Sequence, residues 1–430
     1  MDSELLQLRE LFSSVSDFRS NNLSYALPDI LMSGFVLFSL KSSSLLNFEQ
    51  QNKTSRKNLF NIYGIKKLPS DTQLRAVLDR IDPTFLRDHF ATKFTDLRKT
   101  GILKDYSYKI GSQKYLPISR DGVQHFSSKT INCSCCLSKN HKDGSTTFQH
   151  KFLCAALVHP HKREVFILDA EPIEQQDGIT KNDCELNAAK RLNANWKKQY
   201  GKHQSQYKFL ILEDALYANG VHIKELESQG LNYIINVKPK SHKTLFKCIE
   251  GKDKRKHLKT YSFTQDGIKH EFKYVNDVLL NNSHPNLRVN FVHYVETDKK
   301  GNKKVFSWIT NIKISNAKLV AIMRAGRARW KVENEVFNTL KNLGYHFEHN
   351  FGHGKDHLST MFAYLMLMAF YIDQFVQVCS KVFIQLEKGI RTKIKLWESI
   401  RGLFAFQTFS SMSALYYKAA EEFEIKIRAS

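Results

Sequence analysis

The sequence lacks a hydrophobic run long enough to span a bilayer. Its longest apolar run, Met361 to Ile372, is followed by Asp373, and it is shorter than the roughly 20 residues that a membrane-spanning helix needs. We interpret this run as a buried helix. The first residues, Met1 to Gln7, contain neither a basic leader nor an apolar segment of signal-peptide length. These absences predict a cytoplasmic protein that is not inserted in a membrane.

Acidic residues are scarce relative to basic ones. The 430 residues include 65 Lys and Arg against 42 Asp and Glu, which gives a formal net charge of +23. This excess favours a polyanionic partner such as nucleic acid, although an anionic membrane surface would attract the same charge. The length exceeds that of one simple core and predicts two or three domains.

Cysteine is also sparse. Seven cysteines, an odd number in a chain of this length, argue against a disulfide framework and fit a reducing compartment. Cys133, Cys135 and Cys136 crowd together, with His141 and His150 downstream, which allows a zinc site as one interpretation. The Cys-x-Cys-Cys spacing matches no common zinc module, so free thiols are favoured and zinc is the alternative.

Residues 1–105 have the pattern of a helical N-terminal domain. Leu5, Leu8 and Leu11 fall on one helix face, and Ser70 or Asp71 is placed to cap a further helix. Such a domain could be a packing platform or could recognise the ends of a specific DNA.

From residue 115 the pattern changes to short apolar runs that are typical of strands. Asp121 directly follows the first run and Asp214 the fourth, where ligands of open α/β sheets usually bind. The order of strands and helix predicts a mixed α/β sheet. The predicted elements are strands at Tyr115–Ser119, Phe152–His159, Glu164–Ala170, Lys208–Leu212 and Tyr233–Val237, and a helix around Asp183–Gln199.

Residues 236–306 are predicted to form a β-rich basic insertion. The stretch from Val237 to Thr260 is rich in Lys and Arg. Alternating residues from Val289 to Val295 and a run from Val305 to Ile309 flank a basic turn at 298–302, which predicts a β-hairpin. We expect this insertion to lie against nucleic acid, with a solvated basic face as the alternative.

Helices are predicted for the rest of the chain. One begins at Ser315 or Asn316 and continues past Gly326 to Lys341, carrying Glu333, and another covers about Leu358 to Val378. The segment 381–430 is predicted to be helical, with no functional pattern.

Three carboxylates, Asp121, Asp214 and Glu333, are the candidate catalytic and metal-binding residues. Two stand beside predicted strands and one on a predicted helix, so only folding could bring them together. Chemistry at phosphorus with two cations needs such oxygen ligands. Each residue alone would more often be a turn residue, a helix cap or a solvated charge.

The joint pattern resembles the DDE transposases of bacterial insertion sequences, in the class with a β-rich insertion between the second Asp and the Glu. The motifs that carry the resemblance are Ser119-Arg120-Asp121-Gly122, Leu212-Glu213-Asp214-Ala215-Leu216-Tyr217 and Arg329-Trp330-Lys331-Val332-Glu333-Asn334-Glu335. The resemblance implies an α/β fold with a ribonuclease H-like catalytic domain over 106–380. It also implies Mg²⁺ or Mn²⁺, with two ions expected, bound by the three acids. The expected partner is double-stranded DNA, comprising terminal repeats and target, with a homodimer assembled on it.

That family commonly has a helical pattern of Tyr, Arg, Glu and Lys. Here Arg329 stands four residues before Glu333, Gly326 occupies the Tyr position, and Lys341 stands eight after Glu333 instead of seven. In an unbroken α-helix Lys341 would point about 80° away from Glu333. Glu335 is the alternative third carboxylate. The predicted phosphate contacts are Arg324, Arg327, Arg329 and Lys341.

Two further charged groups receive different interpretations. His349, His353 and His357 are spaced by four, but the glycines between them make a continuous helix unlikely to form, so we favour a structural loop over a metal site. Charged residues of the predicted helix are interpreted as a solvated face: Lys181, Asp183, Glu185 and Arg191.

Three functions fit these observations. The leading hypothesis is a transposase that cuts the ends of its mobile element and joins them to target DNA. A metal-dependent DNA nuclease without strand transfer would use the same carboxylates. A transposase-derived protein that binds DNA without cutting is the third.

Overall fold

The N-terminal part of the computed structural model is helical, as predicted. The structure describes residues 1–20, 23–174 and 184–427. Ser70 caps its helix by accepting a hydrogen bond from the Gln73 amide. The helices are α1 (Asp2–Ser14), α2 (Leu27–Ser39), α3 (Leu45–Asn52), α4 (Arg56–Tyr63), α5 (Asp71–Leu78), α6 (Thr84–Lys99) and α7 (Ile102–Asp105).

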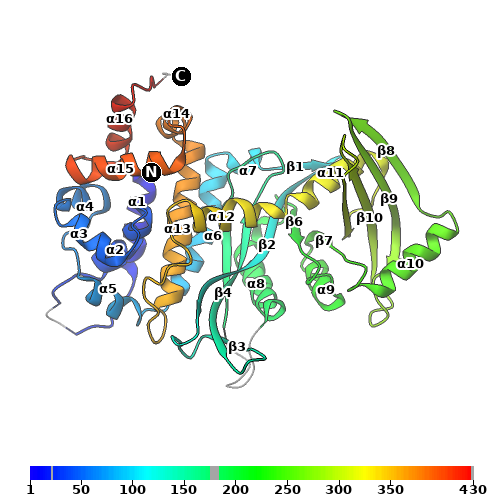
Figure 1. The fold of residues 1–430 in the computed structure, drawn as a ribbon, viewed down its shortest axis with the longest axis horizontal. Coiled ribbons are helices and arrows are strands. Elements are labelled where there is room, and N and C mark those ends of the chain that lie inside the picture. The colour runs from blue at the N-terminus through cyan, green and yellow to red at the C-terminus, as the bar shows by residue number, and fades with distance from the viewer. Residues whose placement is uncertain (21–22, 175–183, 428–430) are drawn as a thin grey trace.

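A mixed sheet occupies the centre of the molecule (Figure 1). Its central strands are ordered β5-β4-β2-β6-β7, with β6 and β7 parallel to β2, and β4 antiparallel to both β2 and β5. This mixed α/β arrangement is consistent with a ribonuclease H-like domain. The strands are β1 (Tyr108–Ile110), β2 (Gln113–Ser128), β3 (Leu137–Asn140), β4 (Thr146–Leu157), β5 (Phe166–Ile173), β6 (Phe209–Glu213) and β7 (Asn232–Asn236).

The first of the predicted strands is longer than expected. We expected it to end at Ser119, before Asp121, but β2 continues to Ser128 and Asp121 pairs with Cys154 of β4. The long antiparallel ladder with β4 supplies the backbone hydrogen bonds that keep the chain extended beyond the apolar run.

The helices between the strands are α8 (Glu185–Tyr200) and α9 (Gly220–Ser228), with a short 3-10 turn at Gly201–His203.

Residues after β7 extend the same sheet. β11 (Lys303–Thr310) pairs antiparallel with β7, and β10 (Arg288–Thr297), β9 (Ile268–Leu279) and β8 (Lys259–Gln265) follow in that order to the edge (Figure 1). The predicted hairpin is confirmed, with Val295 opposite Val305. The basic stretch contains a helix that we did not predict, α10 (Lys243–Lys254).

The helix predicted to run continuously to Lys341 is interrupted. α11 ends at Arg327 (Asn316–Arg327), and the next helical turns are a π-helix over Val332–Phe337, which contains Glu333, and α12 (Asn338–Asn342). The expectation of one regular α-helix was therefore wrong. The π-helical segment contacts β2 and β4.

The predicted apolar helix is α13 (Leu358–Cys379), and its run from Met361 to Ile372 is buried as expected. By length and composition α13 could cross a membrane, but 89% of its most apolar window is buried inside the molecule. It lies between the N-terminal helices and the sheet (Figure 1) and contacts α2, α5, α6 and β5. The helices after it are α14 (Lys381–Gly389), α15 (Lys393–Phe406) and α16 (Met412–Glu422).

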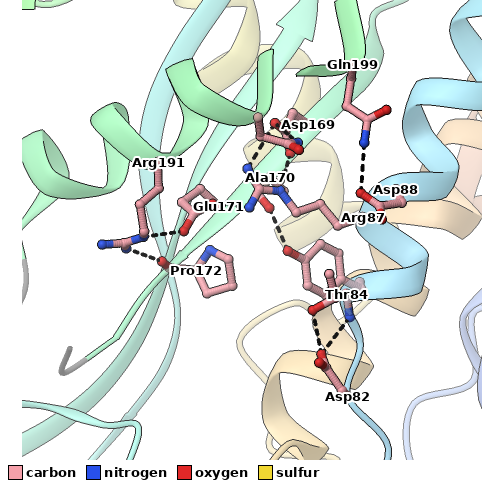
Figure 2. A network of polar contacts seen from close by, with 12 residues as sticks. Asp82, Thr84, Arg87, Asp88, Asp169, Ala170, Glu171, Pro172, Arg191 and Gln199 are labelled. Carbon is pink, nitrogen blue, oxygen red and sulfur yellow. Dashed lines mark hydrogen bonds and ion pairs between the residues drawn. The ribbon is translucent and has the colours of Figure 1, made fainter. Parts of the chain in front are cut away.

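Buried charges join α6 to the sheet and to α8 (Figure 2). Arg87 of α6 reaches Asp169 of β5 through two hydrogen bonds of 2.6 and 3.1 Å, and it also pairs with Glu171. Arg191 of α8 donates to Glu171 at 2.5 Å. Removing one partner of a buried ion pair leaves the other charge unpaired and strongly destabilises the fold. This network therefore fixes how the N-terminal helices pack against the sheet.

Candidate active site

Asp121 and Asp214 lie side by side at neighbouring strands. Ser119 of β2 is opposite Leu212 of the parallel strand β6, so two residues further on Asp121 is level with Asp214. Asp214 is the first residue after β6, and its Oδ1 accepts a hydrogen bond of 2.8 Å from the Leu216 amide. Asp121 Oδ1 accepts one of 3.0 Å from the Gly122 amide. Both carboxylates are half-buried.

Burial and the charges of two neighbouring residues shift the pKa of the Asp121 carboxyl. Burial raises the pKa of the Asp121 carboxyl, Arg329 opposes that rise, and the charge of Asp214 adds to it. Arg329 Nη1 lies 2.8 Å from Asp121 Oδ2. The two aspartates are therefore close enough to repel, which is the arrangement that a bound cation would stabilise.

A further carboxylate, Glu185, joins this pair. A Cβ atom on Gly122 would lie 2.7 Å from Glu185 Oε1, so the glycine leaves the room that this carboxylate occupies. Tyr217 donates a hydrogen bond of 3.3 Å to Glu185 Oε2. Burial and the charges of Asp121 and Asp214 raise the pKa of Glu185 above its ordinary value, against the hydrogen bond from Tyr217.

We interpreted Glu185 as part of a solvated helix face, and the structure contradicts that interpretation. It is at the first position of α8, where the helix starts beside Asp121. No periodicity distinguishes an inward first-turn Glu from a solvated one. Arg191 on the same helix pairs with Glu171, while Lys181 and Asp183 lie outside the described residues.

The two candidates for the third carboxylate on the π-helical segment have different surroundings. Glu335 Oε2 is 3.6 Å from the exposed Arg163, in the connection between β4 and β5. That connection lies beside Pro117, toward the start of β2, because the Val158 amide donates to the Pro117 carbonyl. Glu335 thus pairs away from Asp121. Glu333 is half-buried on the segment that packs against β2 and β4.

The π-helix accounts for the spacing of Lys341. A π-turn closes its hydrogen bonds five residues apart instead of four, so it inserts about one extra residue into the helix. By this count Lys341, eight residues after Glu333, corresponds to position seven of an unbroken α-helix. The 80° offset was calculated for an unbroken α-helix, and the π-helix contradicts that condition. Lys341 Nζ lies 2.7 Å from Glu348.

The remaining predicted phosphate contacts differ in their surroundings. Arg329 is buried and holds Asp121. Arg327 pairs with Glu296 of β10 at 2.5 Å and lies over the Phe306 ring. Arg324 and Arg327 line a hollow together with half-exposed Trp330. Gly326 packs so closely on Trp308 that a Cβ would lie 2.7 Å from its ring, so a tyrosine has no room there.

A buried ion pair supports the two aspartates from the opposite face of the sheet. Arg120 and Glu213 each precede one of them, and their side chains meet at 3.4 Å with no exposure. Glu213 also pairs with His222 at 2.8 Å, and Arg120 donates to Asn193 of α8 at 2.6 Å. Although burial opposes ionisation, His222 and Arg120 hold the pKa of Glu213 below its ordinary value. The pair ties β2 to β6 at the level of the site.

A basic groove adjoins Asp214. The residues that line it come from the turn after β6, the segment after β7 and the end of β9. Exposed Lys238, Lys240 and Lys243 are among them. The groove therefore places cationic side chains next to one of the two aspartates, where a phosphate backbone could bind.

Residues 171–371 match the family model described as the transposase DDE domain. This part of the chain is a transposase DDE domain. The match contains Asp214, Glu185 and Glu333, and Asp121 joins them from β2, which precedes the matched residues. No curated protein matches the chain.

The donor set of this transposase DDE domain fits the divalent metal ions that the family generally uses. The converging side chains, Asp121, Asp214 and Glu185, offer carboxylate oxygens, which are the ligands that Mg²⁺ and Mn²⁺ prefer. Burial first, and then the charges of the neighbouring carboxylates, raise the pKa values of Asp121 and Glu185, and a cation would relieve both effects.

Proposed function

We propose that the chain is a DNA transposase that binds the ends of a mobile element, cleaves them with the help of Mg²⁺ or Mn²⁺, and joins the freed 3′-hydroxyls to target DNA. The observation that carries this proposal is the parallel register of β2 and β6, which sets Asp121 level with Asp214. The transposase DDE domain supports it.

The roles of the side chains follow from their contacts. Asp121 and Asp214 would hold the cations, with Glu333 as the predicted third ligand and Glu185 as a further carboxylate beside Asp121. When bound, the cations would activate the attacking oxygen and stabilise the leaving oxygen of each in-line displacement at phosphorus. Arg329 orients Asp121 through its 2.8 Å ion pair, and Tyr217 orients Glu185.

The basic surface would bind the substrate. Lys238, Lys240 and Lys243 beside Asp214 would contact the DNA backbone. Arg324 and Arg327 of α11 would make a second contact, at the separate hollow that they line. We also propose a homodimer on DNA, in which each copy of the chain binds one of the two element ends. We place the protein in the cytoplasm, where such DNA is accessible.

The proposal is tested with the DNA that flanks the gene in its own genome. Purified protein is incubated with that DNA and Mg²⁺ or Mn²⁺, beside an Asp121→Asn variant and an Asp253→Asn control on the exposed face of α10. Metal-dependent cuts at a pair of inverted repeats, lost only with Asp121→Asn, are expected. Uncut DNA under every condition would contradict the proposal.

Strand transfer needs a separate assay, because hydrolysis uses the same carboxylates. A precleaved end with a free 3′-hydroxyl is supplied together with target DNA. Joined products are expected, and cleavage without joining would identify a nuclease instead.

A further inference from the structure

Four metal-binding side chains converge away from the carboxylates. Cys133 and Cys136 come from the connection between β2 and β3, His150 from β4, and His353 from the loop between α12 and α13. Each offers one ligand atom, and the four atoms lie within 4.8 Å of one another. Cys136, His150 and His353 are buried, and Cys133 is half-buried.

We propose that these four residues bind a structural Zn²⁺ ion. The sulfurs of Cys133 and Cys136 are 3.8 Å apart. His150 Nε2 lies 3.4 Å from the Cys133 sulfur and 3.3 Å from the Cys136 sulfur. His353 Nε2 is 3.3 Å from the Cys136 sulfur and 3.1 Å from His150 Nε2.

These separations match a tetrahedral zinc site. Zn–S bonds of about 2.3 Å and Zn–N bonds of about 2.0 Å in a tetrahedron require about 3.8 Å between two sulfurs, about 3.5 Å between sulfur and nitrogen, and about 3.3 Å between two nitrogens. The five separations given above agree with this order and nearly with these lengths.

Neither a disulfide bond nor hydrogen bonding alone accounts for the cluster as well as a cation does. The sulfurs are much farther apart than the roughly 2.05 Å of a disulfide bond. A cluster held by hydrogen bonds alone would depend on weak S–H donors and would leave lone pairs facing one another. A cation accepts all four lone pairs at once. Thiolate and imidazole ligands select Zn²⁺ over the hard Mg²⁺ of a carboxylate site.

The surroundings also prepare the ligands. The Cys136 amide donates to the Cys133 carbonyl at 3.2 Å, which closes a tight turn that brings both sulfurs to one side. His353 Nδ1 lies 3.0 Å from the Gly354 carbonyl, and donation there leaves Nε2 unprotonated toward the cluster. With four protein ligands the site is closed, as in structural zinc sites.

This ligand set differs from the zinc site that the cysteine cluster suggested and from the metal site that His349, His353 and His357 suggested. The structure uses a Cys-x-x-Cys pair, Cys133 and Cys136, whereas Cys135 lies toward the Asp356 carbonyl and His141 bonds Thr147. His353 takes part without its neighbours at four-residue spacing. His353 could not be assigned to this cluster from the sequence, because it lies 203 residues after His150.

The bound ion would fix the position of the helical segment that carries Glu333. The loop that contains His353 follows α12 directly. His150 belongs to β4, which pairs with β2 at Asp121, and Cys133 and Cys136 belong to the connection that leaves β2. A metal bridge between them would hold the two halves of the carboxylate site in place from outside it.

The experiment begins with the full chain purified under reducing conditions without a metal-affinity tag. Elemental analysis is expected to show a single zinc ion per chain. X-ray absorption of this protein is expected to show two sulfur and two nitrogen neighbours, at about 2.3 and 2.0 Å. This spectrum requires no variant, so a variant that fails to fold does not affect it.

Variants then assign the ligands. Cys133→Ser and His353→Ala are expected to lose most of the zinc, and the matched controls Cys135→Ser and His141→Ala to keep it. Asp214→Asn is expected to keep it as well, because the carboxylate site is separate. Chelation is expected to lower the thermal unfolding midpoint of the unaltered protein.

Several results would overturn the proposal. One is protein without stoichiometric zinc, another is a Cys133–Cys136 disulfide in the mass spectrum, and a third is a zinc spectrum dominated by oxygen. Zinc loss in Cys135→Ser or His141→Ala would refute this ligand set.

Discussion

Asp121 has two charged neighbours of opposite sign. Arg329 balances its charge at 2.8 Å, and Glu185 stands beside the following glycine. The aspartates themselves could be predicted, because each accompanies an apolar strand run in the sequence. Glu185 could not be predicted, because its position depends on where α8 begins relative to β2, which is determined by tertiary packing.

Glu185 is predicted to affect the reaction through its position. Gly122→Ala would place a Cβ 2.7 Å from Glu185 Oε1 and displace the carboxylate. We expect cleavage to fall by up to about 100-fold, the order of loss that a misplacement of about 1 Å can cause, and Glu185→Gln to fall as far. Binding of the same DNA, measured by gel shift, should be unchanged. Full activity in both variants would remove Glu185 from the site.

Glu333 and Glu335 should behave oppositely. Glu333→Gln is expected to abolish metal-dependent cleavage, whereas Glu335→Gln is expected to retain it, because Glu335 pairs with Arg163 outside the site. Cleavage rates of the two variants, measured side by side with matched thermal unfolding, decide between them. The reverse result would make Glu335 the ligand.

At the scale of elements, the π-helix changes what the spacing around Glu333 means. The 80° offset of Lys341 was calculated with the 3.6 residues per turn of an α-helix. Residues 332–337 have the hydrogen-bond pattern of a π-helix instead. The sequence around Glu333 predicted the helix but not this irregularity, because side-chain pattern does not report the hydrogen-bond ladder. By residue count Lys341 then corresponds to position seven after Glu333, and its side chain pairs with Glu348.

The start of α13 depends on Asp79. Its carboxylate accepts hydrogen bonds from four successive amides, at residues 355–358, with lengths of 2.8 to 3.0 Å. Although burial acts to raise the pKa of Asp79, these bonds hold it below its ordinary value. The stabilisation is therefore complete above the unfolded-state pKa of about 3.9 and is lost as the pH falls through the lower folded-state pKa.

We expect Asp79→Asn to lower the free energy of unfolding at neutral pH by about 1 kcal/mol, since the group is partly solvated. The difference between the two proteins should shrink as the pH falls below about 3.9. Denaturant unfolding at several pH values measures it, with Asp253→Asn as a matched exposed control. A difference that does not change with pH would show that the charge of Asp79 is not the cause.

At the scale of the whole molecule, one sheet connects the carboxylates to the basic surface. The strands after β7 continue the sheet from β11 to β8, and the segment between β7 and α10 places lysines beside Asp214. The five central strands and the hairpin were predictable from alternation and turn residues. The long β2 and the helix α10 were not, because the pairing partner of one and the packing of the other lie far away in the sequence.

The groove beside Asp214 should determine part of the salt dependence of DNA binding. Replacing Lys240 and Lys243 by Gln is expected to weaken binding to all sequences, and to reduce the slope of log K against log salt concentration by about 0.9 for each lost phosphate contact. Fluorescence anisotropy over a range of salt concentrations measures the slope. Replacing Lys388 and Lys395 by Gln on α14 and α15 is the control, and an equal effect there would argue against the groove.

The most direct test of the proposed carboxylate site is cleavage of the flanking DNA by the unaltered protein and by Asp214→Asn, with and without Mg²⁺ or Mn²⁺. We expect cuts at inverted repeats that require the metal and that disappear in the variant, while the variant still binds the DNA and unfolds at the same temperature. Cuts that persist in Asp214→Asn, or that need no metal, would contradict it.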